Sequence, residues 1–224
     1  MNDTKHVLEQ LIWLFENNRN LENAVPMAKY MKNHFSFLGI KTPLRRELMR
    51  QIFSTTGILK ADIQLDLIEA LWEKDKREYQ YAALDYLNKS LKKLDEQHLP
   101  FIEKLITTKS WWDTVDSLSP KAVGEIAKKH PNVIPETIDK WVQSENLWLR
   151  RAAILFQLKY KTETDENLLY RYILLNADSK EFFIQKAIGW VLREYSKTNP
   201  DSVRKFITEN ELAKLSIREG SKYL

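Results

Sequence analysis

The stretch from Lys109 to Ser117 contains the side chains of this sequence that are best suited to chemistry. Two adjacent tryptophans, at positions 111 and 112, are followed at once by Asp113 and Asp116. On a helix the two indoles point about 100° apart, whereas Trp112 and Asp116, four residues apart, lie on one face. An indole beside a carboxylate suits a ligand that is cationic and has an apolar surface. The alternative is structural, with a tryptophan in the core and Asp116 capping a helix or paired with a cation.

The elements that position this stretch are predicted to be helices throughout. Apolar residues recur at helical spacing from the N-terminus onward, and no convincing alternation of period two and no Asn-Gly or Asp-Gly hairpin turn occurs. Pro26 is expected to open a helix, Thr42 to cap the next one, and Pro120 to kink or split a helix. One helix is expected to begin at residue 42 and another to end at residue 129. The other helical segments are expected over residues 1–25, 26–39, 65–72, 79–91, 100–106, 131–142, 147–161, 167–175, 182–197 and 200–208. The predicted fold class is all-α.

Internal repeats are expected when amphipathic helices follow one another in this way. The segments Tyr81–Leu84, Arg151–Ile154 and Lys186–Gly189 resemble one another, the first two 70 residues apart and the last two 35. A helix–turn–helix unit of this length is typical of HEAT-like or armadillo-like repeats, which stack into a solenoid with a concave binding face. We therefore expect a single helical repeat domain over residues 1–224. Steps of 35 give the series Arg46, Tyr81, Asp116, Arg151 and Lys186.

Stacking of such repeats places equivalent residues side by side, because packed helices lie roughly 8–10 Å apart. Two indoles are then expected to flank one carboxylate and two cations, with a further cation one turn beyond. These residues are Trp112, Asp116, Arg151, Lys186, Trp190 and Arg193. There is a structural alternative for each part of this site. Trp190 alone could be a core residue, and Asp116 and Arg151 could form a salt bridge between repeats.

Positive charge is concentrated near the N-terminus. The net charge of +4 is mild, but the segment from Met27 to Arg50 holds six cations against one acid, Glu47. The cations are Lys29, Lys32, Lys41, Arg45, Arg46 and Arg50, and they are interspersed with Tyr30, His34 and Thr42. Each cation alone could be solvated surface, but the cluster is typical of a surface that faces phosphates.

Composition excludes several other classes of site. With no cysteine, the chain has no disulfide, iron–sulfur cluster or thiolate zinc site, and its four histidines are scattered, so neither a metal nor a cofactor is expected. Hydrophobic residues make up 43% and charged residues 29%, no apolar run approaches a membrane span, and the first residues lack a signal-peptide core. We therefore expect a cytoplasmic monomer without a membrane partner.

Four blocks of the chain carry a family resemblance: Met27–Phe35, Lys109–Ser117, Leu147–Phe156 and Lys180–Tyr195. In these blocks the sequence closely resembles the AlkD family of bacterial DNA alkylation repair proteins, which are HEAT-like-repeat DNA glycosylases. The resemblance implies that the partner is duplex DNA and that purines alkylated at ring nitrogen three or seven are excised from it. One departure is that family members usually continue for another helix where this chain stops at Leu224. A shortened terminal repeat is expected to weaken the cap or the DNA grip rather than the chemistry.

The resemblance also assigns roles to residues. The family's catalytic aspartate falls on Asp116, its active-site tryptophans on Trp112 and Trp190, its catalytic-site arginine on Arg151 and its DNA-contacting tyrosine on Tyr30. Further DNA contacts are expected from Thr42, Arg46, Lys159, Lys186 and Arg193.

These residue types fit the implied reaction. Loss of a cationic purine leaves an oxocarbenium-like sugar, which an ionised Asp116 can stabilise while it orients water. Indole faces can stabilise the same cation, and Arg151 is expected to keep Asp116 ionised. The resemblance further implies that no pocket encloses the base. Three alternatives are a DNA-binding repeat protein without catalysis, a protein-interaction scaffold, and a Schiff-base lyase that uses Lys186.

Overall fold

The computed structural model describes residues 4–224, and every regular element in this range is helical. Residues 1–3, on which part of the signal-peptide expectation falls, lie outside the described residues. The chain divides into two compact units, an N-terminal unit up to Lys93 and a C-terminal unit from Leu94. The predicted all-α class is confirmed, whereas a single domain with one concave face remains a prediction.

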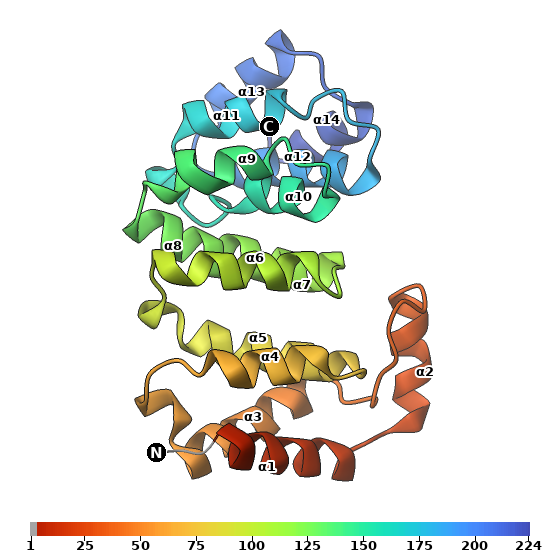
Figure 1. Cartoon of the computed structure of the whole chain (residues 1–224). Coiled ribbons are helices and arrows are strands. Elements are labelled where there is room, and N and C mark those ends of the chain that lie inside the picture. Colours follow the sequence, from red (N-terminus) through yellow and green to blue (C-terminus); the bar gives the residue numbers. More distant parts are fainter. Residues whose placement is uncertain (1–3) are drawn as a thin grey trace. The chain divides into compact units, whose positions relative to one another are not determined.

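Within residues 4–93 the N-terminal unit contains five α-helices (Figure 1). They are α1 (Thr4–Asn17), α2 (Leu21–Tyr30), α3 (Thr42–Thr56), α4 (Leu65–Glu73) and α5 (Arg77–Lys89). Helix α1 packs on α3 and α4, and α5 packs on α3 and α4. Short 3₁₀ turns follow at Ile58–Lys60 and Leu91–Lys93.

Two predicted helix starts in this unit are wrong. Helix α2 begins before Pro26, because the side chain of Asn20 caps it by accepting a hydrogen bond from the N–H of Asn23 at 2.9 Å. Pro26 therefore lies inside the helix. Thr42 is the first residue of α3 rather than its cap, which is Lys41, and no side chain caps this end.

A buried carboxylate holds the segment between α2 and α3 against α5. Glu78 accepts hydrogen bonds from the N–H groups of Leu38, Gly39 and Ile40 at 2.9, 2.8 and 3.1 Å. Gly39 has φ +92°, and a Cβ there would lie 1.8 Å from the Asn20 carbonyl oxygen, so only glycine fits. Because this segment leads directly into Thr42, the anchor fixes the start of α3.

The C-terminal unit contains the remaining helices (Figure 1). They are α6 (Leu99–Thr107), α7 (Trp112–Leu118), α8 (Gly124–Lys129), α9 (Asp139–Trp141), α10 (Leu147–Leu155), α11 (Glu166–Leu174), α12 (Phe182–Tyr195), α13 (Pro200–Glu209) and α14 (Lys214–Gly220). Short 3₁₀ turns cover Glu96–His98 and Lys161–Glu163, and π-helical turns cover Ser119–Val123 and Ile134–Ile138. Helix α14, which the sequence patterns did not predict, packs closely on α12.

Pro120 splits its helix as predicted. It has no N–H to donate to the carbonyl of Asp116 four residues earlier, and its ring crowds that carbonyl. The chain accordingly widens into the π-helical turn between α7 and α8, which begins three residues after Asp116. Such π-turns often occur at functional sites.

Side-chain contacts follow the predicted repeat length within each unit. Many hydrogen bonds join residues 31–40 positions apart, among them Lys93 to Leu59, Tyr160 to Gly124 and Asn176 to Val142. In the C-terminal unit one step of the series is confirmed, because Arg151 contacts Asp116, whereas the next residue, Lys186, pairs with Glu219. In the N-terminal unit it is one residue off, because Arg45, rather than Arg46, lies over the ring of Tyr81.

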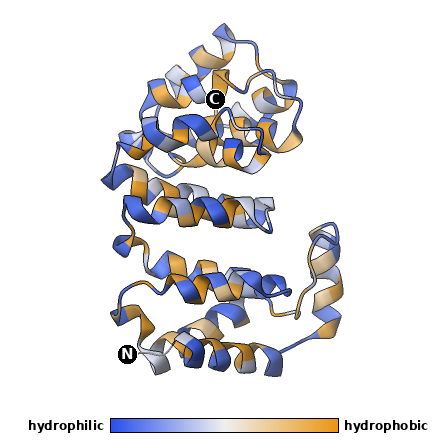
Figure 2. Cartoon of the chain, viewed as in Figure 1, coloured by the Kyte–Doolittle hydropathy of each residue, from blue (hydrophilic) through white to orange (hydrophobic). Residues whose placement is uncertain are grey.

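Most of the helices bury one face, and apolar and polar residues accordingly alternate along them (Figure 2), whereas α2 has no buried residue. In the C-terminal unit a core of aliphatic side chains joins α10, α11, α12 and α13, and Trp190 packs against its edge. Burial of each such side chain contributes about 1.5–3 kcal/mol. None of the helices described over residues 4–224 has the length and apolar character that crossing a bilayer requires.

Candidate active site

Asp116 and Arg151 form a two-point ion pair in the C-terminal unit. The Nε of Arg151 donates to Oδ1 of Asp116 at 2.7 Å, and its Nη2 donates to Oδ2 at 2.9 Å. Arg151 is 4% exposed, whereas the Asp116 side chain keeps 18% of its surface open. The guanidinium of the pair is therefore buried, whereas part of the carboxylate is accessible to solvent.

Burial raises the pKa of the Asp116 carboxyl above its ordinary value, and nearby Asp113 adds to the shift. The Arg151 guanidinium opposes the rise through its hydrogen bonds and its charge. Arg151 thus favours the ionised form of Asp116, as expected, but desolvation raises the pKa of Asp116 by more than Arg151 lowers it. Asp116 is consequently a stronger base than an ordinary aspartate.

A third hydrogen bond joins the pair to α12. The Nη1 of Arg151 donates to the Phe183 carbonyl at 2.5 Å, so one side chain links α7, α10 and α12. The ring of Phe183 lies 5.1 Å from those of both Trp111 and Trp148. These three residues stand at or just before the starts of α7, α10 and α12, 37 and 35 positions apart. That spacing was the signal in the sequence for a cluster that sequence reasoning missed.

The local backbone separates the roles of the two adjacent tryptophans. Trp111 precedes α7 in an extended conformation, with φ −159° and ψ 167°, and its ring joins the aromatic cluster. Trp112 begins α7 one turn before Asp116 and is half-buried. Trp190, also half-buried, lies on α12, and both α7 and α12 pack against α10. The two tryptophans of the predicted site thus lie on the helices that flank Arg151.

Two predicted DNA-binding cations of α12 share a carboxylate that sequence reasoning missed. Lys186 Nζ lies 3.3 Å and Arg193 Nη1 3.1 Å from the oxygens of Glu219 on α14. Because α14 lies beyond the predicted series, no spacing pointed to Glu219. The ion pair with Glu219 already engages the Lys186 amine, which disfavours its use as the nucleophile of a Schiff-base lyase.

The other predicted DNA-binding residues are at the surface. Tyr30 ends α2 and is 70% exposed, Thr42 and Arg46 are exposed on the first turns of α3, and Lys159 is exposed after α10. Arg45 differs from the other cations of the basic segment, because it is 8% exposed and its Nε donates to Asp85 at 2.8 Å. The prediction that Arg45 belongs to the phosphate-facing cluster is therefore wrong.

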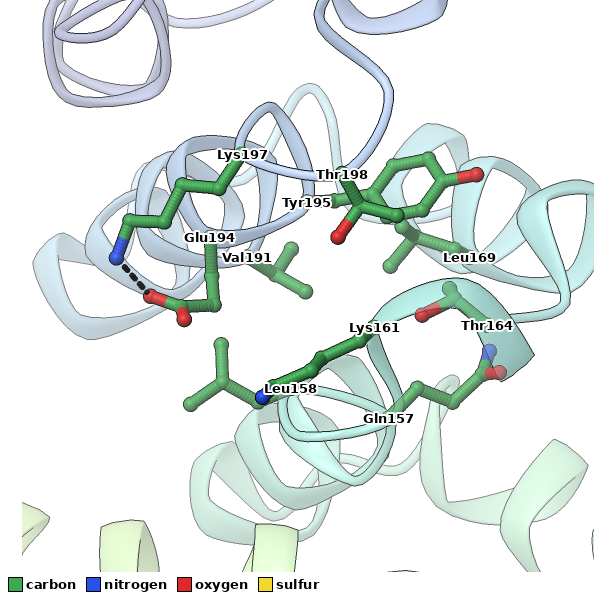
Figure 3. Close-up of a pocket in the computed structure, with 10 residues that line it drawn as sticks. All are labelled: Gln157, Leu158, Lys161, Thr164, Leu169, Val191, Glu194, Tyr195, Lys197 and Thr198. Atoms are coloured by element: carbon green, nitrogen blue, oxygen red, sulfur yellow. Dashed lines mark hydrogen bonds and ion pairs between the residues drawn. The ribbon is translucent and has the colours of Figure 1, made fainter.

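One pocket of the C-terminal unit, of about 270 Å³, lies apart from Asp116 (Figure 3). It lies between α12 and the segment that follows α10, and Lys197 pairs with Glu194 at its rim. None of Trp112, Asp116, Arg151 or Trp190 lines it. Within residues 4–224 no group of three or more histidine, aspartate or glutamate side chains could hold a metal ion.

Comparison with known proteins decides the family. A model of the DNA alkylation repair enzyme family matches residues 11–224. The chain belongs to this family. The match covers both units and every residue of the candidate site, so the resemblance to AlkD-family proteins is confirmed. No curated protein sequence matches the chain significantly.

Solved structures support the family assignment. A predicted DNA alkylation repair enzyme from Enterococcus faecalis is 37% identical, with a TM-score of 0.81 over 92% of this chain and 96% of that one. The smu.31 protein of Streptococcus mutans UA159 is 22% identical, with a TM-score of 0.59 over 80% of this chain and 97% of that one. AlkD2 from Streptococcus mutans is 23% identical, with a TM-score of 0.56 over 71% and 80%. The last two share the helical repeat fold with this member of the family.

Proposed function

We propose that this protein is a DNA glycosylase that removes purines alkylated at ring nitrogen three or seven from duplex DNA. The observation that carries the proposal is the partly open carboxylate of Asp116, held at both oxygens by Arg151 and one helical turn from Trp112. A fixed carboxylate beside an indole is suited to a sugar that becomes cationic. Membership of a DNA alkylation repair family supplies the substrate class.

In the proposed reaction the bond between C1′ and the purine nitrogen breaks, and the base leaves with the bonding electrons. This neutralises the positive charge that alkylation placed on the purine. Asp116 stabilises the resulting sugar cation, since each of its oxygens keeps a lone pair beyond the one that Arg151 uses. Water adds to C1′ and gives up a proton, which Asp116 can accept. The products are an abasic sugar and a neutral free base.

Arg151 is proposed to position Asp116 rather than to bind substrate through free donors. Three of its hydrogen bonds are already made, two to Asp116 and one to the Phe183 carbonyl. A planar guanidinium holds a carboxylate in one orientation, which a lysine could not do. Catalysis by preorganised charge depends on that orientation, because no reorganisation is then needed during the reaction.

The proposed experiment incubates the protein with duplex DNA methylated at purines and separates released bases by chromatography. Release of N7-methylguanine or N3-methyladenine is expected from the parent protein and not from Asp116→Asn. Release at equal rates by both proteins would remove Asp116 from the mechanism. Absence of release by the folded, DNA-bound parent would contradict the proposal altogether.

One observation favours a second function, that of a DNA-binding repeat protein without catalysis. Both Asp116 oxygens are occupied by Arg151, as in a purely structural ion pair. On this reading Asp116→Asn lowers stability, and neither protein releases bases although both bind duplex DNA. The same chromatographic experiment separates the two functions.

A further inference from the structure

Four cations of the C-terminal unit surround the carboxylate of Glu219. Lys222 Nζ lies at 2.7 Å, Arg193 Nη1 at 3.1 Å, Lys186 Nζ at 3.3 Å and Arg218 Nη2 at 3.9 Å from its oxygens. Glu219 itself is 7% exposed. Hydrogen bonds and charge from Lys222 and Lys186 lower the pKa of Glu219 to about 2, so the carboxylate is anionic at neutral pH.

The backbone holds Glu219 in place. Helix α14 crosses α12 at Gly189, where an added Cβ would lie 2.5 Å from the Glu219 Cβ. The hydroxyl of Ser216, one turn earlier on α14, donates to the Gln185 carbonyl of α12 at 2.9 Å. These contacts fix the Cα and Cβ of Glu219 against α12, so the side chain starts from a defined position beside Lys186 and Arg193.

The cluster keeps an excess of three positive charges after Glu219 is counted. An ammonium group has three donors and a guanidinium has five, so most donors around this one carboxylate remain available for another acceptor. Arg218 is 71% exposed and Lys222 is 47% exposed, which places such donors at the surface. Without the central Glu219 carboxylate, the four cations would repel one another and move apart.

We propose that Glu219 is a positioning residue that gathers Lys186, Arg193 and Lys222 into one binding site for a phosphate of the DNA backbone. Helix α14 is then part of the DNA-binding surface, to which Arg218 and Lys222 add contacts that sequence reasoning did not predict. This inference rests on the proposed function, because duplex DNA supplies the phosphate.

The first test is the sign of the effect of Glu219→Gln on DNA affinity. This variant makes the protein more positive by one charge. If the Glu219 carboxylate merely repels DNA, its removal should therefore tighten binding. A positioning role predicts weaker binding, by about three- to tenfold near 0.1 M salt, because one ordered phosphate contact is lost. Tighter binding by a folded Glu219→Gln protein would overturn the inference.

The second test keeps Glu219 and removes the exposed cations, so it does not depend on how well Glu219→Gln folds. Lys222→Ala and Arg218→Ala are each expected to weaken binding about three- to tenfold and to lower the slope of log affinity against log salt by about one. Lys205→Ala, which removes an exposed lysine of α13, is the matched control and should change neither quantity. A purely structural role would change the melting temperature but not the salt slope.

The two proposals fail in different ways. If the parent binds duplex DNA and releases bases while Lys222→Ala and Arg218→Ala bind like the parent, the α14 site is wrong and the glycosylase proposal stands. If Lys222→Ala and Arg218→Ala weaken binding but no protein releases bases, the α14 site stands as a DNA contact. A parent that does not bind duplex DNA would overturn both.

Discussion

Each unit of the molecule contains a buried arginine that pairs with an aspartate of another helix. Arg45 and Arg151 are 8% and 4% exposed, and their Nε atoms lie 2.8 and 2.7 Å from oxygens of Asp85 and Asp116. In each case an aromatic residue, Tyr81 or Trp112, precedes the aspartate by four positions on the same helix. The two pairs therefore share their residue types and the position of the aromatic residue, although the arginine lies 40 positions before Asp85 and 35 positions after Asp116.

Their surroundings differ. The guanidinium of Arg45 lies 4.9 Å from the centre of the Tyr81 ring, and that of Arg77 lies 5.9 Å from it, so cations already occupy this aromatic ring. Arg151 instead contacts both oxygens of Asp116 and the Phe183 carbonyl. Burial raises the pKa of Asp116. An arginine–aspartate pair is thus by itself a structural feature. The surroundings of the Asp116 pair make that pair a candidate for chemistry.

The largest expected effect concerns the charge of the lesion. If Asp116 acts on the sugar, the leaving base must be cationic, so release of N7-methylguanine should exceed that of uracil or hypoxanthine by at least about 10²-fold. Bulky cationic adducts should also be released, because in the proposed mechanism Asp116 acts on the sugar and no pocket has to enclose the base. A panel of duplexes carrying small cationic, bulky cationic and small neutral lesions measures this directly. Efficient uracil release, or rejection of every bulky cationic adduct, would show that a base pocket exists.

A smaller effect is expected from the basic surface of the N-terminal unit. Arg46→Glu reverses an exposed charge and should weaken duplex binding about ten- to fiftyfold near 0.1 M salt, with little change in sequence preference. Substitution of the adjacent Arg45 should instead lower the melting temperature, because it leaves Asp85 without its partner. Titrations at several salt concentrations, with thermal unfolding in parallel, separate the two arginines. Equal binding by Arg46→Glu and the parent would place the DNA surface elsewhere.

The fold was more predictable from the sequence than the site. Helical periodicity, the 35-residue spacing and Pro120 can be read directly along the sequence, and they predicted the all-α class, the repeat length and the break after Asp116. The start of α2 was wrong, because Asn20 caps it six residues before Pro26. Glu219 and the Phe183 carbonyl were missed, because their contacts depend on how helices far apart in the sequence pack together. Arg45 and Arg46 illustrate the limit, since neighbouring arginines lie in opposite environments.

The smallest expected effect is the pH dependence of base release. Asp116 must be ionised to stabilise the sugar cation, and burial raises its pKa above the ordinary aspartate value. As the pH falls through that raised pKa, the rate at saturating DNA should fall by about tenfold per pH unit. Asp85→Asn should show the same profile as the parent, because its pair plays no part in the chemistry. A rate that stays constant down to the ordinary aspartate pKa would contradict the assignment of Asp116.

The difference between the two pairs is tested most directly by comparing Asp116→Asn with Asp85→Asn. Both variants preserve shape and remove one negative charge beside a buried arginine, so both should lower the free energy of unfolding by similar amounts, about 1–3 kcal/mol. Single-turnover release of N7-methylguanine at saturating duplex should fall about 10²- to 10³-fold for Asp116→Asn and less than about threefold for Asp85→Asn. Equal rates for the two variants would contradict the account, because the Asp116 pair would then be as structural as its counterpart.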